Sequence, residues 1–203
     1  MNPKVVFCDN HVLVVDKPAM MVTQAAEGHQ TSLEEWAKAW VKEKYQKPGA
    51  VFLHAIHRLD KEVSGLVLFA RTSKALSRLN QAMREGKIQK TYEALVEGIL
   101  SSSEGTLSHD LEHKEHRAEI GTGKKAVLHF LVLKKYKDTT LVEIQLETGR
   151  YHQIRAQFSA IGHPIVGDKK YGSKISHTSP GIALRHVKLV FPHPINGQLV
   201  ELK

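Results

Sequence analysis

Strand-like segments in this chain outnumber helical ones, and the two kinds do not alternate along the sequence. The segments with strand-like apolar runs or period-2 alternation are Val5–Phe7, Val12–Asp16, Gly65–Ala70, Ile88–Glu97, Lys125–Tyr136, Thr140–Glu147, Ile182–Phe191 and Leu199–Leu202. Helical segments run from the capping signal Thr31-Ser32-Leu33-Glu34 to about Tyr45, from Thr72-Ser73 to Gly86, and from Tyr151 to Ile161. A doubly wound parallel sheet requires strict alternation of strands and helices. The order therefore predicts an α+β fold with a mixed, mostly antiparallel sheet, in which residues 98–124 form a polar loop.

Length and composition limit the kinds of protein that this chain can form. A chain of 203 residues can bury one full core, or at most two small ones. Cys8 is the only cysteine, which excludes an internal disulfide and a cysteine-based zinc module. No apolar stretch approaches the roughly 18 residues that cross a bilayer, and Met1-Asn2-Pro3 lacks the core of a signal peptide. We therefore expect a cytoplasmic protein with no membrane contact, and a monomer because no extra apolar surface is evident.

The charge balance is strongly basic, which favours a polyanionic partner. The formal net charge is +8 at pH 7, and the sequence pI is about 9.5. Contacts with phosphates release counterions and so supply affinity without reading a base sequence. A basic surface also serves solubility or attraction to anionic lipid, but nucleic acid is the favoured partner. Aromatic residues make up only 6% of the chain, so we do not expect a broad stacking platform for single strands.

One carboxylate lies between two cations in the segment His57-Arg58-Leu59-Asp60-Lys61-Glu62-Val63-Ser64-Gly65-Leu66-Val67. Neighbouring cations keep a carboxyl group charged, and the apolar run that follows predicts burial beside a dry strand. Such an arrangement holds a single reactive acid ready, and Asp60 is the candidate. The alternative is an ordinary salt-bridged turn without a chemical role, which the spacing alone favours.

A second dense cluster is Thr148-Gly149-Arg150-Tyr151-His152-Gln153-Ile154-Arg155. Its glycine precedes a helix start, where unpaired N–H groups and the helix dipole attract a phosphate. His152, Arg155 and Ser159 flank the apolar stripe of the predicted helix, so Arg155 can reach a buried site. The alternative, which is the commoner situation, is a helix with basic residues on its solvated side.

Four separated motifs follow one another along the chain. They are His57-Arg58-Leu59-Asp60-Lys61-Glu62-x-Ser64-Gly65, Lys90-Thr91-Tyr92, Thr148-Gly149-Arg150-x-His152-Gln153-Ile154-Arg155 and Gly162-His163-Pro164-Ile165-x-Gly167-Asp168-x-x-Tyr171-Gly172. Together they resemble the pseudouridine synthases of the RluA type. The opening segment from Asp9 to Ala19 is also similar to that family, as are Leu184-Arg185-His186 and Phe191-x-His193-Pro194 near the end. The likeness runs from about residue 5 to the C-terminus.

The resemblance implies an isomerase that modifies RNA. It implies one catalytic domain over residues 1–203, a long mixed sheet flanked by helices, a central cleft, and no separate S4-like RNA-binding domain. Converting uridine to pseudouridine breaks the N1–C1′ bond, joins C5 to C1′ and removes the C5 proton. Because this is a net isomerisation, we expect neither a cofactor nor a metal.

Three residues carry the catalytic roles that the resemblance implies. Asp60 would act at the ribose, either as nucleophile at C1′ or as base at C2′. Arg155 would be the partner that keeps Asp60 charged and aimed, because a buried unpaired acid is costly. Tyr92, which alternation also places on the inward side of its strand, would stack on the uracil and accept the C5 proton. The alternative for Tyr92 is a core tyrosine with a satisfied hydroxyl.

The residues expected to contact RNA are Arg58, His57, Lys90, Arg150 and His152. Arg58 would fill the space that an extruded base leaves, whereas His57 braces the turn more than it titrates. The expected substrate is transfer RNA, ribosomal RNA or both. The chain departs from the family pattern at Met20, where glycine is usual, and at Gln24, where a histidine often stands. Both departures fall in a loop, so RNA contact or local shape would differ there.

Three rival interpretations remain open. His109, His113 and His116 have i, i+4, i+7 spacing, which on a helix would form a metal site, although a solvated mixed-charge loop is the simpler interpretation. A non-catalytic RNA-binding protein could keep the same fold, but it would have no need for a buried acid such as Asp60. A nuclease or nucleoside hydrolase would need a second carboxylate. Asp168 is the nearest one, and we interpret it as structural, capping or holding its turn.

Overall fold

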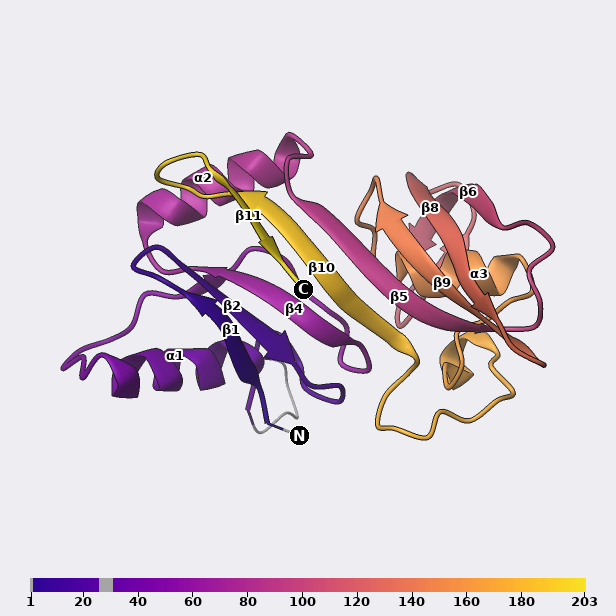
Figure 1. Ribbon diagram of the computed structural model, residues 1–203, viewed down its shortest axis with the longest axis horizontal. Coiled ribbons are helices and arrows are strands. Elements are labelled where there is room, and N and C mark those ends of the chain that lie inside the picture. The colour runs from indigo at the N-terminus through magenta and orange to yellow at the C-terminus, as the bar shows by residue number, and fades with distance from the viewer. Residues whose placement is uncertain (1, 26–30) are drawn as a thin grey trace. The chain divides into compact units, whose positions relative to one another are not determined.

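The computed structural model describes residues 2–25 and 31–203, and the chain divides into two compact units. The first unit comprises residues 1–89 and 188–203, and the second comprises residues 90–187 (Figure 1). The chain thus leaves the first unit once and returns to it once. Within the described residues, no helix combines the length and the apolar character that spanning a membrane requires.

The first unit is built on antiparallel strands. They are β1 (Lys4–Cys8), β2 (Val12–Lys17), β3 (His54–Ala55), β4 (Ser64–Ala70), the later part of β10 (Leu184–Pro192) and β11 (Leu199–Leu202). β2 pairs with β1 on one side and β4 on the other, while β3 pairs with β4 and β11 with β10. Residues 12–15 and 66–70 are at most 3% exposed, so β2 and β4 are covered on both faces. This explains their continuous apolar runs and confirms the predicted strands.

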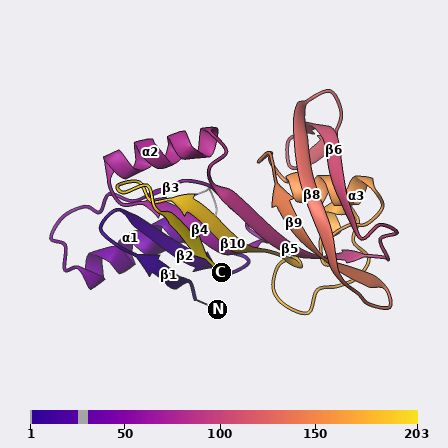
Figure 2. The same ribbon diagram turned by 45° about the horizontal axis from the view of Figure 1, so that its top comes forward.

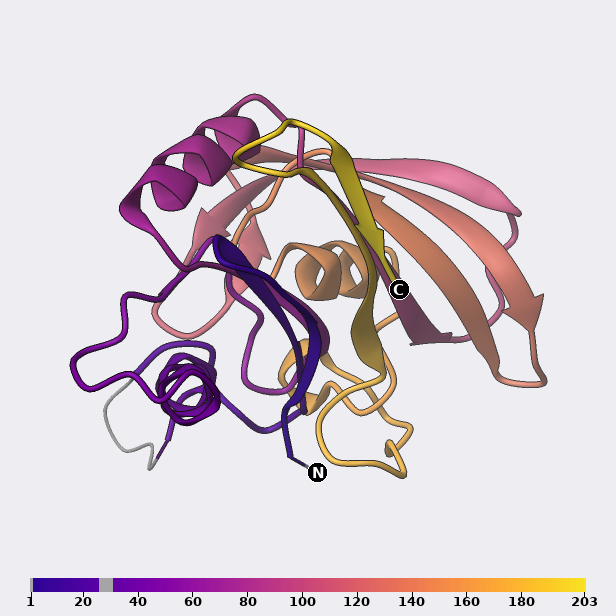
Figure 3. The same ribbon diagram turned by 60° about the vertical axis from the view of Figure 1, so that its left-hand side comes forward.

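Two helices belong to the first unit. α1 (Leu33–Lys44) lies beside β1 and β2, as the end-on view in Figure 3 shows. α2 (Ser73–Arg84) begins after Thr72, whose hydroxyl accepts the N–H of Ala75, as predicted. The apolar side of α2 packs on alternate residues of β2 and β4, in a cluster that includes Val12, Val14, Leu66, Leu68, Ala75, Leu79 and Ala82.

The predicted capping box of α1 is shifted by one residue. Ser32, rather than Thr31, is the N-cap: its hydroxyl accepts the N–H of Glu35, and the Glu35 carboxylate accepts the N–H of Ser32 at 2.8 Å. The run Thr31-Ser32-Leu33-Glu34-Glu35 offers two overlapping boxes. The second box is used because it starts the helix at Leu33, whose side chain is fully buried.

The second unit contains a strongly curved set of antiparallel strands with one helix. The strands are β5 (Gln89–Glu97), β6 (Glu104–His113), β7 (Ala118–Ile120), β8 (Lys124–Lys135), β9 (Thr139–Leu146) and the start of β10. The order from β5 onward is β5-β9-β8-β6-β7. The β8–β9 hairpin and strand β5 confirm the predictions for these segments. Figure 2 shows β6, β8 and β9 side by side, with α3 next to them.

The prediction of a loop for residues 98–124 is wrong, because β6 and β7 lie in this segment. β6 pairs with β8 from Glu104 to Leu111, and β7 continues from β6 as a short hairpin. From Glu104 to Leu111, only alternate residues of β6 are even partly covered, and many side chains of the strand are polar. A half-solvated strand of this composition carries a weak apolar signal, and pairing with β8 decides its conformation.

The predicted helix over residues 151–161 is confirmed, although it is shorter. α3 (Gln153–Ala160) starts two residues later because His152 adopts a left-handed conformation with φ of 50°. A one-turn 3-10 helix, η1 (Lys169–Tyr171), follows. With separated helices and antiparallel pairing in every strand pair described above, the predicted α+β class with a mostly antiparallel sheet is confirmed.

Candidate active site

The turn that carries Asp60 is fixed from both sides by backbone contacts. The hydroxyl of Thr23 donates to the carbonyl of Leu59 at 2.9 Å and accepts its N–H at 3.1 Å. The N–H of Val63 donates to the carbonyl of Asp60 at 3.1 Å, which closes the turn before β4 begins. Leu59 and Val63 are buried, and Asp60 between them is half-buried. The carboxyl group of Asp60 therefore stands on a backbone that cannot easily rearrange.

The two residues before Leu59 differ in how they are placed. Nε2 of His57 accepts the N–H of Leu68 from the middle of β4 at 3.2 Å, so this histidine braces the turn against the strand. Arg58 is exposed. The contacts of both residues with RNA stay predictions.

Lys17 lies beneath this turn, and the sequence analysis did not assign it a role. Its side chain is fully buried, and its Nζ donates to the carbonyls of Pro18 at 3.1 Å, Met21 at 2.6 Å and Lys61 at 3.4 Å. Burial lowers the pKa of Lys17 to about 8, and the negative charges of Asp60 and Glu62 oppose that shift. Lys17 therefore ties the segment 18–21 to the residue that follows Asp60.

A signal in the sequence could have identified Lys17. Side chains alternate along a strand, so Leu13, Val15 and Lys17 share one side of β2. Leu13 and Val15 are fully buried. A lysine on the same side of a strand as two core residues is expected to be buried. A buried ammonium group needs hydrogen-bond acceptors.

In the second unit, Tyr92 occupies the inward side of β5, as predicted. It is 6% exposed and is flanked on its strand by the buried residues Ala94 and Val96. Its ring stacks on the ring of His186 from β10, with centroids 4.7 Å apart and an interplanar angle of 21°. His186 is fully buried. The stacking fixes the plane of the Tyr92 ring, so His186 is a positioning residue that the sequence analysis had noted only as part of a motif.

Arg155 is the second buried cation, and it is held by a carboxylate. Its Nε donates to Oδ2 of Asp168 at 2.6 Å and its Nη2 to Oδ1 at 2.9 Å, with side chains 2% and 1% exposed. The alternative of a solvated basic helix face is therefore wrong for Arg155. Asp168 is structural, as interpreted from the sequence, and its carbonyl accepts the N–H groups of Tyr171 and Ser173 in its turn. The prediction of a side-chain cap is wrong, because none is formed at η1 and the carboxylate binds Arg155 instead. The Asp60–Arg155 pairing joins residues of different units and stays a prediction.

Arg155 also determines the protonation of His152. An arginine can only donate, so its Nη1 donates to Nε2 of His152 at 3.0 Å. In the neutral ring the proton then lies on Nδ1, which is 2.9 Å from the hydroxyl of Tyr171. That hydroxyl also accepts the N–H of Ala118 at 2.7 Å and donates to its carbonyl at 3.2 Å. His152 is 7% exposed, so the structure gives it an orienting role, and its contact with RNA stays a prediction.

Two buried glutamines dock α3 on the strands. Gln153 donates to the carbonyl of Val127 at 3.0 Å and accepts the N–H of Arg150 at 2.9 Å through its Oε1. Gln157 donates to the carbonyl of Ala126 at 3.0 Å. These contacts tie α3 to strand β8, which contains Ala126 and Val127. They also show that Gln153, a residue of the motif from Thr148 to Arg155, packs α3 against the strands.

The remaining predicted RNA contacts lie close to this helix start. Arg150 is exposed, and its Nε donates to the carbonyl of Lys125 at 3.0 Å. Burial lowers the pKa of Lys90, at the start of β5. Its Nζ is near Gly149, where a Cβ would come within 3.5 Å of it. Both residues are available for a phosphate at this end of the second unit, and that role stays a prediction.

The three histidines considered as metal ligands do not lie on a helix. His109 and His113 belong to strand β6, and His116 lies in the turn that follows. Nδ1 of His109 is 3.2 Å from the amide nitrogen of Gln157, and the His113 ring contacts Tyr151. Among the described residues, no group of three or more His, Cys, Asp or Glu side chains is arranged to hold a metal ion.

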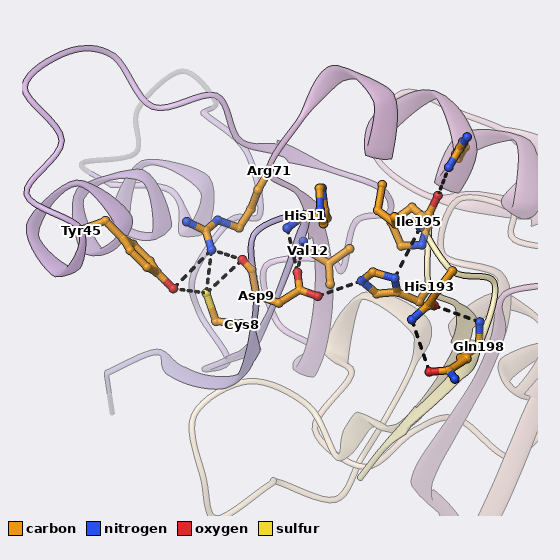
Figure 4. Close-up of polar contacts among 12 residues, drawn as sticks. Cys8, Asp9, His11, Val12, Tyr45, Arg71, His193, Ile195 and Gln198 are labelled. Atoms are coloured by element: carbon orange, nitrogen blue, oxygen red, sulfur yellow. Dashed lines mark hydrogen bonds and ion pairs between the residues drawn. The ribbon is translucent and has the colours of Figure 1, made fainter.

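The motif residues Asp9 and His193 form a cluster at the end of β2 that is remote from the Asp60 turn (Figure 4). Oδ1 of Asp9 accepts the N–H groups of His11 and Val12 at 2.7 and 2.8 Å. Oδ2 accepts Nε2–H of His193 at 2.8 Å, and Arg71 donates to the Asp9 carbonyl. The cluster therefore joins the β1–β2 turn to the end of β4 and to the β10–β11 turn.

Residues 11–160 match the family model described as RNA pseudouridylate synthase. The chain belongs to this family. Its members are isomerases that act on RNA, and the RluA-type resemblance found in the sequence is confirmed by the relatives.

Three relatives illustrate the similarity. The uncharacterized RNA pseudouridine synthase YlyB of Bacillus subtilis is 36% identical over 208 residues, which cover 100% of this chain and 69% of that protein. The dual-specificity RNA pseudouridine synthase RluA of Haemophilus influenzae is 34% identical, with 96% and 89% covered. The ribosomal large subunit pseudouridine synthase D of Pseudomonas aeruginosa is 37% identical, with 84% and 54% covered. The chain thus spans between about half and nine tenths of the length of these relatives.

A solved structure agrees with the family and the fold. Human RNA pseudouridylate synthase domain containing 1 is 25% identical to this chain and has a TM-score of 0.80, with 99% of this chain and 82% of that one covered. Human RNA pseudouridylate synthase domain containing 4 has the same TM-score at 20% identity, which supports the fold alone.

Proposed function

We propose that this protein converts uridine to pseudouridine in transfer RNA, ribosomal RNA or both. The two units would act together as one catalytic domain, in the cytoplasm and as a monomer, without a cofactor. The names of the relatives support a ribosomal substrate and more than one RNA target, because one relative is named for the large ribosomal subunit and another is a dual-specificity RNA pseudouridine synthase. The net charge of +8 suits a polyanionic substrate.

The observation that carries the proposal is the fixed, half-buried turn around Asp60. A carboxylate on a rigid turn can be aimed at one atom of a bound ribose, which a mobile surface acid cannot. Asp60 would act at C1′ as nucleophile or at C2′ as base, and either route releases uracil from N1–C1′. The base then turns, C5 bonds to C1′, the C5 proton leaves and N1 gains a proton.

Tyr92 and Arg155 would serve this reaction from the second unit. His186 covers one face of the Tyr92 ring, which keeps the ring in the orientation needed to stack on uracil. The Tyr92 hydroxyl would accept the C5 proton. Asp168 holds the Arg155 guanidinium in one plane, because it accepts hydrogen bonds from both Nε and Nη2. A guanidinium held in this way is a suitable partner for the catalytic carboxylate.

The contacts of Asp168 argue against the hydrolytic alternative. A hydrolase that activates water needs a second carboxylate that can take up a proton. Both oxygens of Asp168 accept hydrogen bonds from Arg155, and its side chain is 1% exposed. The nearest candidate for a second acid is therefore engaged in holding the arginine.

Loss of the C5 hydrogen gives a direct assay. The substrate is total RNA labelled with tritium at C5 of uridine, prepared from cells that lack this gene. The wild type is expected to release tritium into water, and Asp60→Asn is expected to lower the rate by about 10³-fold or more while RNA binding is retained. Glu62→Gln, in the same turn, is the matched control and should remain close to wild type. Substantial turnover by Asp60→Asn would contradict the proposal.

A further inference from the structure

We propose that Met20 is a specificity-determining residue that contacts a base of the RNA next to the target uridine. The inference rests on the proposed function, since it places the contact beside Asp60. Met20 lies in the segment between β2 and α1, and its N–H donates to the carbonyl of Lys61 at 2.6 Å. Lys61 is the neighbour of Asp60 in the chain, so Met20 would lie close to a nucleotide whose ribose is bound at Asp60.

The backbone at Met20 has a conformation that disfavours a side chain. Its φ is 68°, in the left-handed region where the Cβ atom of an L residue is crowded. Among the described residues, the other non-glycine residues with positive φ are Gln46 and His152. Gln46 follows the end of α1, where this conformation commonly ends a helix. His152 belongs to the buried network of Arg155. Neither a helix end nor a buried hydrogen-bond network explains the positive φ of Met20.

The side chain of Met20 is also poorly placed for the stability of the first unit. It is 49% exposed, so much of its apolar surface faces water. A glycine would remove the backbone strain, and a polar residue would be better solvated. Strain that the surrounding structure over-determines is a reason to look for a function. An apolar, flexible thioether open to solvent is suited to pack against the face of a base.

The segment presents Met20 in a fixed position. The carbonyls of Pro18 and Met21, on either side of it, accept hydrogen bonds from the buried ammonium of Lys17. The Met20 N–H is anchored on the Asp60 turn, as described above. Because the backbone is ordered before RNA binds, little entropy is lost when the side chain makes a contact. Met20 and the exposed Arg58 would then contribute apolar and cationic contacts on either side of Asp60.

The experiment separates the side chain from the backbone. Met20→Ala removes the side chain and keeps the strain, Met20→Gly removes both, and Met20→Leu keeps apolar bulk. Gln46→Gly is the control that relieves the same kind of strain away from Asp60. Each variant is measured for tritium release from the labelled total RNA described above, for RNA binding by filter retention, and for thermal unfolding.

Met20→Ala and Met20→Gly are both expected to raise KM and weaken RNA retention about three- to tenfold, with kcat little changed. Met20→Leu should remain near wild type. Met20→Gly and Gln46→Gly should each raise the melting temperature by about 2–4 °C, whereas Met20→Ala should not. The KM effect should persist at high salt, because the contact is apolar.

Wild-type KM and RNA retention in both Met20→Ala and Met20→Gly would overturn the inference, and so would a loss in Met20→Leu equal to that in Met20→Ala. Failure of the proposed function gives a different result, namely no tritium release by the wild type itself. The filter-retention measurement of RNA binding then still shows whether Met20 contacts RNA.

Discussion

Among the described residues, each unit fully buries one lysine or arginine, but the two cations are stabilised in different ways. In the first unit, Nζ of Lys17 donates to three backbone carbonyls. In the second unit, Arg155 forms a bidentate ion pair with Asp168. Burial lowers the pKa of Lys17 to about 8. An arginine stays protonated in proteins, so its charge is permanent.

This difference indicates that the two buried cations have different roles. The Lys17 ammonium organises a loop, and it can lose its proton at mildly alkaline pH without breaking an ion pair. The Arg155 guanidinium is held by the Asp168 carboxylate and keeps its own charge. The first unit therefore holds the turn around Asp60 with a cation that can lose its proton, and the second holds Arg155 with a charge that is permanent.

The largest expected effect comes from neutralising the partner of Arg155. Asp168→Asn leaves a buried guanidinium without its counter-charge, and a loss of about 3–5 kcal/mol in the free energy of unfolding is expected. Urea unfolding followed by circular dichroism measures it. The control is Glu119→Gln, which removes an exposed ion pair with Arg117 and should cost about 0.5 kcal/mol or less. A loss below about 1 kcal/mol for Asp168→Asn would show that the pair is not the fixed element described here.

A smaller effect is expected from the titration of Lys17. Its pKa is about 8 in the folded state and 10.5 as the ordinary value, so the unfolded state binds more protons between these pH values. Stability then rises with pH in this window. Relative to Lys17→Met, the wild type should gain roughly 3 kcal/mol between pH 8 and pH 10.5.

Urea unfolding of both proteins over this pH range gives the difference directly. Subtracting the variant removes the contributions of the other lysines, which the two proteins share. A difference that is flat or falls with pH would mean that Lys17 keeps its proton as firmly as Arg155 does. The contrast between the two units would then be lost.

The smallest effect concerns the cluster of Asp9 and His193, which holds strand ends in the first unit. Burial alone would raise the pKa of Asp9, but hydrogen bonds from His11, Val12 and His193 outweigh it, and the pKa is lowered. Asp9→Asn should therefore lower the free energy of unfolding by about 1 kcal/mol at pH 7. The difference from wild type should shrink as the pH falls below 3.8, the ordinary value, through the folded pKa. Equal stabilities at pH 7 would leave the cluster without an energetic role.

Local signals explain which elements could be predicted from the sequence. Thr72 starts α2 and the apolar run of β4 is buried, because capping and burial depend on neighbours in the chain. The Arg155–Asp168 pair could not be predicted, since it depends on how residues 161–168 fold back onto α3. The left-handed conformation of His152 follows from the same packing. Strands β6 and β7 were not predicted from the sequence, because the residues on their exposed side are polar. Only the pairing of β6 with β8 and with β7 distinguishes this segment from a loop.

The proposed function depends most on Asp60, whose carboxylate would be the catalytic nucleophile or base of this RNA pseudouridine synthase. The most direct measurement maps pseudouridines across all RNAs of cells that lack the gene and that carry either the wild type or Asp60→Asn. One or more uridines are expected to stay unmodified without the gene and with Asp60→Asn, and to be modified again with the wild type. Restoration by Asp60→Asn, or maps that are identical with and without the gene, would contradict the proposed function.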